Sequence, residues 1–128
     1  MHKSKQAFTM IELIFVIVVL GILASVAIPK LAASRNDASA SVVALSLGDC
    51  IEMAGGSYGM TEAFDMNSAS CDIASVDNLC FTFTPSNATG VLNVKDVAGV
   101  TNGSVCKLAQ TLVSRNSLSS AGGIDHQF

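Results

Sequence analysis

The sequence has few of the side chains on which enzymes usually depend. Charged residues make up 13% of the 128-residue chain, where about a quarter is usual, tryptophan is absent and there are two histidines. His2 and His126 lie near opposite ends of the chain, so neither has metal-ligand spacing from a cysteine. There is also no phosphate-binding loop and no G-x-S-x-G nucleophile motif. The sequence therefore predicts a protein that is not an enzyme and has no metal site or cofactor.

Basic charge is also scarce. Two of the seven Lys and Arg residues, Lys3 and Lys5, lie in the first seven positions, and no basic cluster follows them. Without those two, five basic residues stand against ten acidic ones, a formal net charge of about −5. This sign argues against nucleic acid as a partner bound through the general surface field.

Apolar residues, by contrast, form one long run near the N-terminus. From Phe8 to Ile28 there are 21 residues with Glu12 as the only charge. As a helix they would extend about 31 Å at about 1.5 Å per residue, close to the hydrocarbon thickness of a bilayer, about 30 Å. The lysines before the run predict that it crosses the membrane once, with everything after Pro29 outside the cytoplasm.

Two ordinary interpretations of this run leave Glu12 unexplained. A secretory signal peptide cut after "SVA", residues 25 to 27, would release a soluble protein beginning at Ile28. Its apolar region is usually about 7 to 15 residues long and would not include a carboxylate. A plain membrane anchor fits the length only. An ionisable residue inside a span is a functional hypothesis by default, with snorkelling of Glu12 to the membrane face as the alternative.

The stretch "KQAFTMIELIFVIVVLGILASVAIP" resembles the N-terminus of type IV pilins and type II secretion pseudopilins. These proteins share a short basic leader, a Phe at the cleavage point, a Thr and a Glu shortly after it, and a Pro closing the apolar half-helix. The resemblance implies that prepilin peptidase cuts between Ala7 and Phe8 and methylates the new N-terminus of Phe8. The family usually has Gly before the cut, and Ala7 is the next smallest side chain.

The resemblance also implies a function. The chain would be a structural subunit that waits in the bacterial inner membrane and is then drawn into a filament, in the periplasm or outside the cell, by an ATPase motor and an inner-membrane platform protein. Glu12 would pair with the Phe8 amine of a neighbouring subunit, because an unpaired charge in a filament core is costly. A pilus, a secretion pseudopilus and a DNA-uptake filament remain open, as does a minor or competence-type subunit that binds DNA or a surface ligand.

The expected organisation is a leader at residues 1 to 7, a transmembrane or filament-core helix at 8 to 29, and a remainder at 30 to 128. Pro29 should kink the helix without ending it. The helix is expected from about Thr9 to Ala54, with a stop at Gly55-Gly56 and a buried stripe consisting of Val43, Leu47, Cys50 and Ala54. The fold class is α+β and pilin-like, with this helix packed on a small antiparallel sheet.

The rest of the chain predicts short elements. Residues 55 to 78 indicate a loop with a helical turn at Thr61 to Phe64, and Leu79 to Val97 indicate an antiparallel hairpin. Asp65, Asn67 and Asp72 lack the ligand spacing of a calcium loop. A helix is expected from Ser104 to Arg115 and a loosely ordered segment after it. Its expected apolar face consists of Val105, Leu108, Leu112 and Val113.

The four cysteines are an even number behind an export signal, which favours disulfides. They allow three connectivities, and the sequence does not decide among them. The preferred pairing is Cys50 with Cys71 and Cys80 with Cys106.

Overall fold

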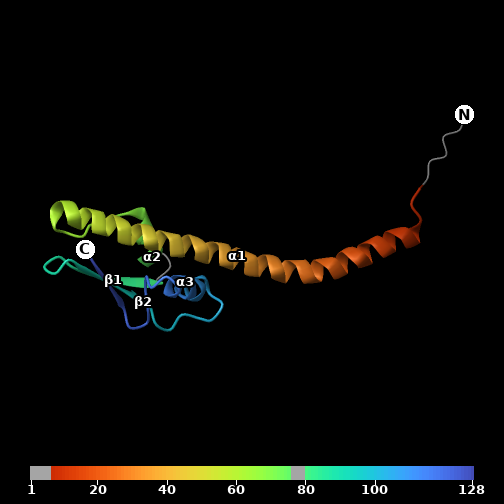
Figure 1. Cartoon of the computed structure of the whole chain (residues 1–128). Helices are drawn as coiled ribbons and strands as arrows, with labels where there is room; N and C mark the ends of the chain where they lie inside the picture. The colour runs from red at the N-terminus through yellow and green to blue at the C-terminus, as the bar shows by residue number, and fades with distance from the viewer. Residues whose placement is uncertain (1–6, 76–79) are drawn as a thin grey trace, which may run out of the picture. The chain divides into compact units, whose positions relative to one another are not determined.

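The computed structural model describes residues 7–75 and 80–128 (Figure 1). Its helices are α1 (Met10–Thr61), α2 (Ala69–Ser75) and α3 (Val105–Ser114), and its strands are β1 (Phe81–Ser86), β2 (Val91–Asp96) and β3 (Ile124–Gln127). The chain divides into two compact units, residues 1–35 and residues 36–128. The expected α+β class, with a long N-terminal helix and a small antiparallel sheet, is confirmed.

The first unit contains the N-terminal part of α1. Every large apolar side chain from Phe8 to Leu31 is exposed, so no described residue buries this part of the helix. Pro29 lies inside α1, and the helix runs through it without ending, as expected. The helix tolerates Pro29 at this position, although a proline removes one backbone hydrogen-bond donor.

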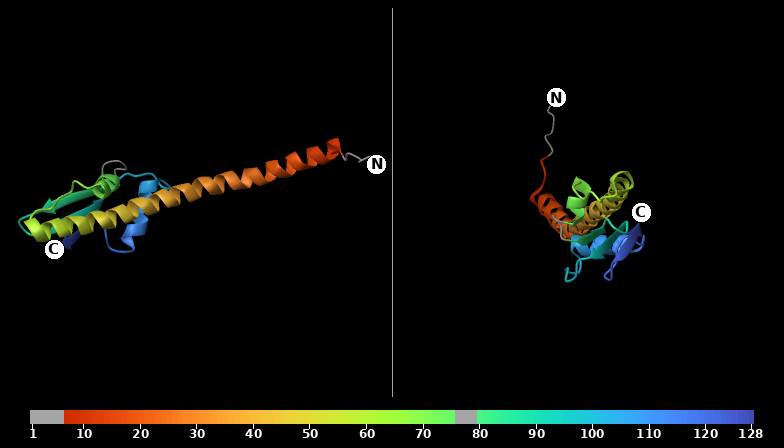
Figure 2. Two further views of the ribbon diagram at one scale, coloured as in Figure 1. Left: turned by 90° about the horizontal axis from the view of Figure 1, so that it is seen from above. Right: turned by 90° about the vertical axis from the view of Figure 1, so that its left-hand side faces the viewer.

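In the second unit, α1 packs along the sheet and α3 (Figure 2). The expected stripe is confirmed, because Val43, Leu47, Cys50 and Ala54 are all buried. They meet Phe81, Leu92 and Val94 of the sheet in one core. A helix with one apolar face and a sheet with one apolar face thus cover each other.

The predicted end of α1 at Gly55-Gly56 is wrong, since the helix continues to Thr61. Two glycines weaken a helix, but contacts from elsewhere support this one. The Phe128 ring lies against Gly55, and Tyr58 stacks on Phe64 at 4.7 Å between ring centroids. Glu62, with φ of 55°, then ends the helix, where the sequence predicted a helical turn.

The sheet has the order β1-β2-β3 and is antiparallel throughout. The predicted hairpin is confirmed, with Phe81 opposite Asp96 and Ser86 opposite Val91. Phe81 is buried and Phe83 half-buried, as the alternation predicts, whereas Leu79 lies outside the described residues. Within the predicted loop, the structure adds α2.

The sequence predicted a loosely ordered C-terminal segment. This prediction is wrong, because β3 pairs with β2. The Phe128 amide donates to the Gly90 carbonyl at 2.9 Å, and the His126 ring lies 2.9 Å from the Leu118 carbonyl oxygen. These hydrogen bonds join the segment to other parts of the chain, so no local sequence pattern predicts them.

Helix α3 begins where predicted, with the Ser104 hydroxyl accepting a hydrogen bond from the Lys107 amide at 3.2 Å. Its buried residues are Ala109, Gln110 and Val113, whereas Leu112 is 37% exposed. The expectation that Leu112 packs inward is therefore wrong. Gln110 takes a buried place because its amide donates to the carbonyls of Cys80 and Val97 at 2.9 and 3.0 Å.

Two disulfides link these elements, Cys50–Cys71 between α1 and α2 and Cys80–Cys106 between the start of β1 and α3. They are the pairs that the sequence analysis prefers. The bridges join residues 21 and 26 positions apart, and each stabilises the fold by about 3 kcal/mol in the chain-entropy account. A small unit with a thin core depends on such links.

Candidate functional site

Thr9 and Glu12 form a reciprocal cap at the start of α1. The Glu12 amide donates to the Thr9 hydroxyl oxygen at 3.3 Å, while the Thr9 amide and hydroxyl both donate to Oε2 of Glu12, at 2.9 and 3.0 Å. The first helical bond follows, from the Leu13 amide to the Thr9 carbonyl at 3.2 Å. This is the capping-box arrangement, which satisfies donors that a helix N-terminus otherwise leaves open.

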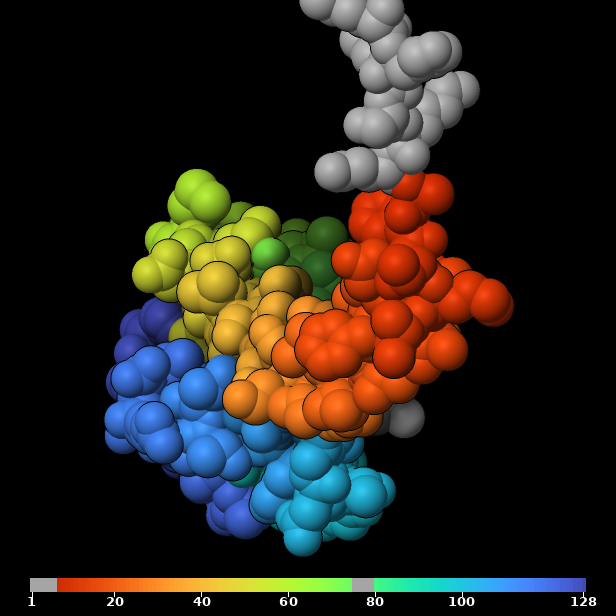
Figure 3. Space-filling model, turned by 90° about the vertical axis from the view of Figure 1, so that its right-hand side faces the viewer, coloured from red at the N-terminus to blue at the C-terminus, as the bar shows by residue number. Residues whose placement is uncertain are grey.

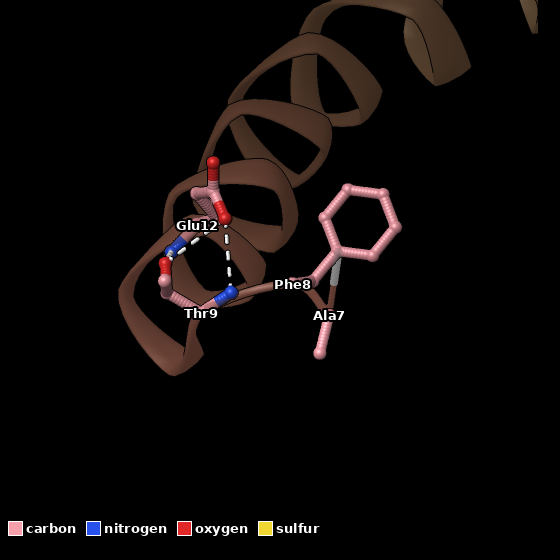
Figure 4. A pocket seen from close by; sticks show the side chains of 4 residues that line it. All are labelled: Ala7, Phe8, Thr9 and Glu12. Carbon is pink, nitrogen blue, oxygen red and sulfur yellow. Dashed lines mark hydrogen bonds between the residues drawn. The ribbon is translucent and has the colours of Figure 1, made fainter. Parts of the chain in front are cut away.

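The cap uses only one oxygen of the Glu12 carboxylate. Both hydrogen bonds from Thr9 end on Oε2, whereas Oε1 points away from Thr9 and has no hydrogen bond to any described residue (Figure 4). Phe8, Ile11, Phe15 and Val16 line an open recess beside the group, and Glu12 itself is exposed. One oxygen is thus fixed by the helix, and the other is available to a cation.

The expected processing residues lie next to this cap. Ala7 and Phe8 precede the helix and are exposed, and together with Thr9 and Glu12 they line a shallow recess (Figure 4). The structure thereby brings together Ala7, Phe8 and Glu12. Pro29 lies further along α1, and the four cysteines belong to the 36–128 unit, so neither contributes to this site.

The sequence analysis did not assign a role to Thr9. The signal was present, because a Thr followed three residues later by a Glu before an apolar run is the pattern of a capping box.

Helix α1 is the one helix in the described residues that is long and apolar enough to cross a membrane, and none of its apolar window is buried within the chain. Among residues 7–75 and 80–128, no group of three His, Cys, Asp or Glu side chains is placed to hold a metal ion. Asp65 accepts a hydrogen bond from the Asn67 amide at 2.9 Å, an ordinary use of an aspartate in a loop.

Comparison with known proteins gives two matches. Residues 2–28 match the family described as the prokaryotic N-terminal methylation motif. The chain is also 34% identical over 87 residues to the type IV wide pilus major component PilA4 of Thermus thermophilus. That alignment covers 68% of this chain and 63% of the relative, so slightly less than two thirds of the relative's length is represented. No solved structure matches the chain significantly.

Proposed function

We propose that the chain belongs to the type IV pilin family and is a structural subunit of a bacterial type IV pilus. The relative is a major component of a pilus, which favours a pilus over a secretion pseudopilus. The N-terminal part of α1 first holds the subunit in the inner membrane, with the 36–128 unit outside the cytoplasm. It then packs against the same helices of other subunits in the filament core, which covers its exposed apolar surface.

Processing would prepare the subunit for this step. Prepilin peptidase cuts between Ala7 and Phe8 and methylates the Phe8 amine. Both residues are exposed and outside the helix, as a protease needs for an extended substrate. Cleavage removes Lys3 and Lys5 and creates a cationic amine four residues before Glu12.

The observation that carries the proposal is the half-used carboxylate of Glu12. Oε2 is held by Thr9, which fixes the side chain at the helix start, and Oε1 is open. We assign Oε1 to the Phe8 amine of a neighbouring subunit. A subunit in the wrong register would bury both charges unpaired, at a cost of several kcal/mol, so the pair selects the register.

This role is structural and involves no chemical reaction by the chain itself. An ATPase motor and an inner-membrane platform protein would extract the subunit from the membrane and add it to the growing filament. The subunits would meet head to tail through different surfaces, and a rotation between them that does not close gives an open helical filament and not a ring.

Mass analysis of the mature protein together with Glu12 variants tests the proposal. Glu12→Gln keeps an amide oxygen that can complete the cap but removes the charge, whereas Glu12→Ala removes both. We expect an N-methylated Phe8 in all variants, and filaments from the wild-type chain but from neither Glu12 variant. Asp72→Asn, which neutralises an exposed carboxylate on α2, is the matched control and should assemble normally.

A mature protein that begins at Ile28 or retains Met1 would contradict the assignment to the pilin class. Normal filaments from Glu12→Gln would instead show that the charge on Glu12 is not needed for assembly.

A further inference from the structure

The 36–128 unit has a groove between α1 and α3, called here the α1–α3 groove. Ser41, Ala44 and Gly48 line it from α1, and Leu112 and Asn116 line it from α3 and its C-terminal end. In Figure 3 the yellow part of α1 and the blue α3 lie next to one another. Leu45, which also lines the groove, is 71% exposed, so a large apolar side chain faces solvent there.

Gly48 makes the groove open. A glycine inside a helix costs about 1 kcal/mol relative to alanine. Nothing within the chain requires it, since a Cβ at Gly48 would meet no atom within 4 Å. Its missing side chain leaves room for a second helix to approach α1 closely.

The groove is acidic. Asp49 and Glu52 line it, and no basic side chain does. Within the part of the chain that the structure describes, neither carboxylate forms an ion pair. The occupant should therefore be helical, small along one face, and basic at its edges.

Such a segment exists in the 1–35 unit of the same chain. At about 100° per residue, Lys30 and Arg35 lie about 140° apart around α1 and flank a stripe consisting of Ala27, Leu31 and Ser34. All five residues are exposed, and among the described residues neither basic side chain has an ionic partner. The small side chains of Ala27 and Ser34 allow close approach of a helix, and Leu31 supplies one large apolar side chain.

The two basic residues are also spaced along the helix so that their side chains can reach the two acidic residues of the groove. Lys30 and Arg35 are five residues apart, about 7.5 Å along a helix, and Asp49 and Glu52 are three residues apart, about 4.5 Å. The long, flexible Lys and Arg side chains span the difference of about 3 Å. Both pairs can therefore form at once.

We propose that the α1–α3 groove is the docking site for residues 27–35 of a second copy of this chain. The inference rests on the proposed function, because a filament supplies the second copy at a fixed offset. Leu31 of the second copy lies against Leu45 and Leu112, and Lys30 and Arg35 pair with Asp49 and Glu52. This contact is separate from the Glu12 pair and acts on a different surface of the subunit.

Reversing the charges of these residues tests the proposal. Each variant replaces the wild-type chain in cells that otherwise assemble it into filaments. We expect Asp49→Lys/Glu52→Lys and Lys30→Glu/Arg35→Glu each to lower filament yield at least about tenfold, corresponding to about 1.4 kcal/mol. Combining all four changes should restore the yield to within about threefold of wild type. Asp72→Lys, which reverses an exposed carboxylate outside the groove, is the control and should have no effect.

Two further measurements separate docking from folding. Gly48→Leu should fill the groove and block filaments without lowering the thermal midpoint, because a Cβ at this position meets no described atom within 4 Å and the rest of the side chain extends into the open groove. A photo-crosslinker at Leu45 should label residues 27–35 of a second copy, identified by mass spectrometry.

The proposal would be overturned if the variant with all four changes gave no higher filament yield than the two charge-reversed variants. Crosslinks from Leu45 to another segment or to a different protein would also overturn it. If the wild-type chain assembles and the reversed variants assemble equally well, only the docking proposal fails. If the wild-type chain forms no filament at all, the proposed function fails with it.

Discussion

The ring of Phe128 lies against Gly55 in α1. A Cβ built on Gly55 would overlap the ring, whereas a Cβ on the neighbouring Gly56 would meet nothing within 4 Å. Phe128 also packs edge-on against Phe64, with 5.8 Å between ring centroids. Phe128 thereby stabilises the stretch of α1 that its two glycines weaken.

This contact predicts opposite effects for two neighbouring substitutions. Gly56→Ala should raise the free energy of unfolding by up to about 1 kcal/mol, because alanine favours the helix and nothing opposes it. Gly55→Ala should gain less or lose stability, since the Phe128 ring must move. Denaturation of the full chain in detergent micelles compares the two. Equal effects would show that the ring does not restrict Gly55, and adding Phe128→Ala should remove the difference.

The reciprocal cap predicts that Thr9 acts by positioning Glu12. Thr9→Val keeps the shape of the side chain but removes the hydroxyl, and should weaken the helix start by about 1 kcal/mol and lower filament yield several-fold. Thr9→Ser retains the hydroxyl and should assemble normally. Electron microscopy measures the yield, and mass analysis verifies that Phe8 is still methylated. Equal yields from the Val and Ser variants would contradict a role for the hydroxyl.

The two bridges predict a large loss of stability on removal. The double variant Cys50→Ser/Cys71→Ser should have a free energy of unfolding about 3 kcal/mol lower than wild type. The double variant Cys80→Ser/Cys106→Ser should show a similar loss. Chemical denaturation with and without a reductant measures both losses. Peptide mapping without reduction checks the pairing, and any other connectivity would contradict the structure.

Gln110 predicts a stability effect without a change in apolar packing. Its amide is the donor to the carbonyls of Cys80 and Val97, so Gln110→Leu leaves both acceptors without that donor. The expected loss is about 1 to 3 kcal/mol in the free energy of unfolding. Thr111→Leu is a suitable control because Thr111 is exposed on the same helix. A neutral Gln110→Leu would show that water replaces the lost donor.

The sequence predicted those parts of the fold that depend on local pattern. Periodic apolar residues identified α1 and its buried stripe, and alternation at Phe81 and Phe83 identified the hairpin. Several of the failures involve distant contacts. The stop at Gly55-Gly56 is overridden by Phe128. On α3 the polar Gln110 is buried, with hydrogen bonds to Cys80 and Val97, whereas Leu112 is exposed. Strand β3 has a single large apolar residue, Ile124, and exists because β2 offers it an edge.

The candidate site was predictable in part. The isolated charge of Glu12 in an apolar run marked the position, and the resemblance supplied an external partner for it. The use of one oxygen by Thr9 is a geometric fact that required the structure, although the spacing of the two residues could have indicated it.

The contacts of Gln127 and Phe128 have a practical consequence for displaying foreign peptides. Besides the ring contact, the Phe128 amide is bonded to Gly90, and the Gln127 side chain donates to the Thr89 carbonyl at 2.9 Å. An affinity tag fused after Phe128 would pull on these bonds. The exposed turn at residues 98–103, where Gly99 and Gly103 adopt positive φ, has no such attachments among the described contacts and is the better insertion point for an epitope.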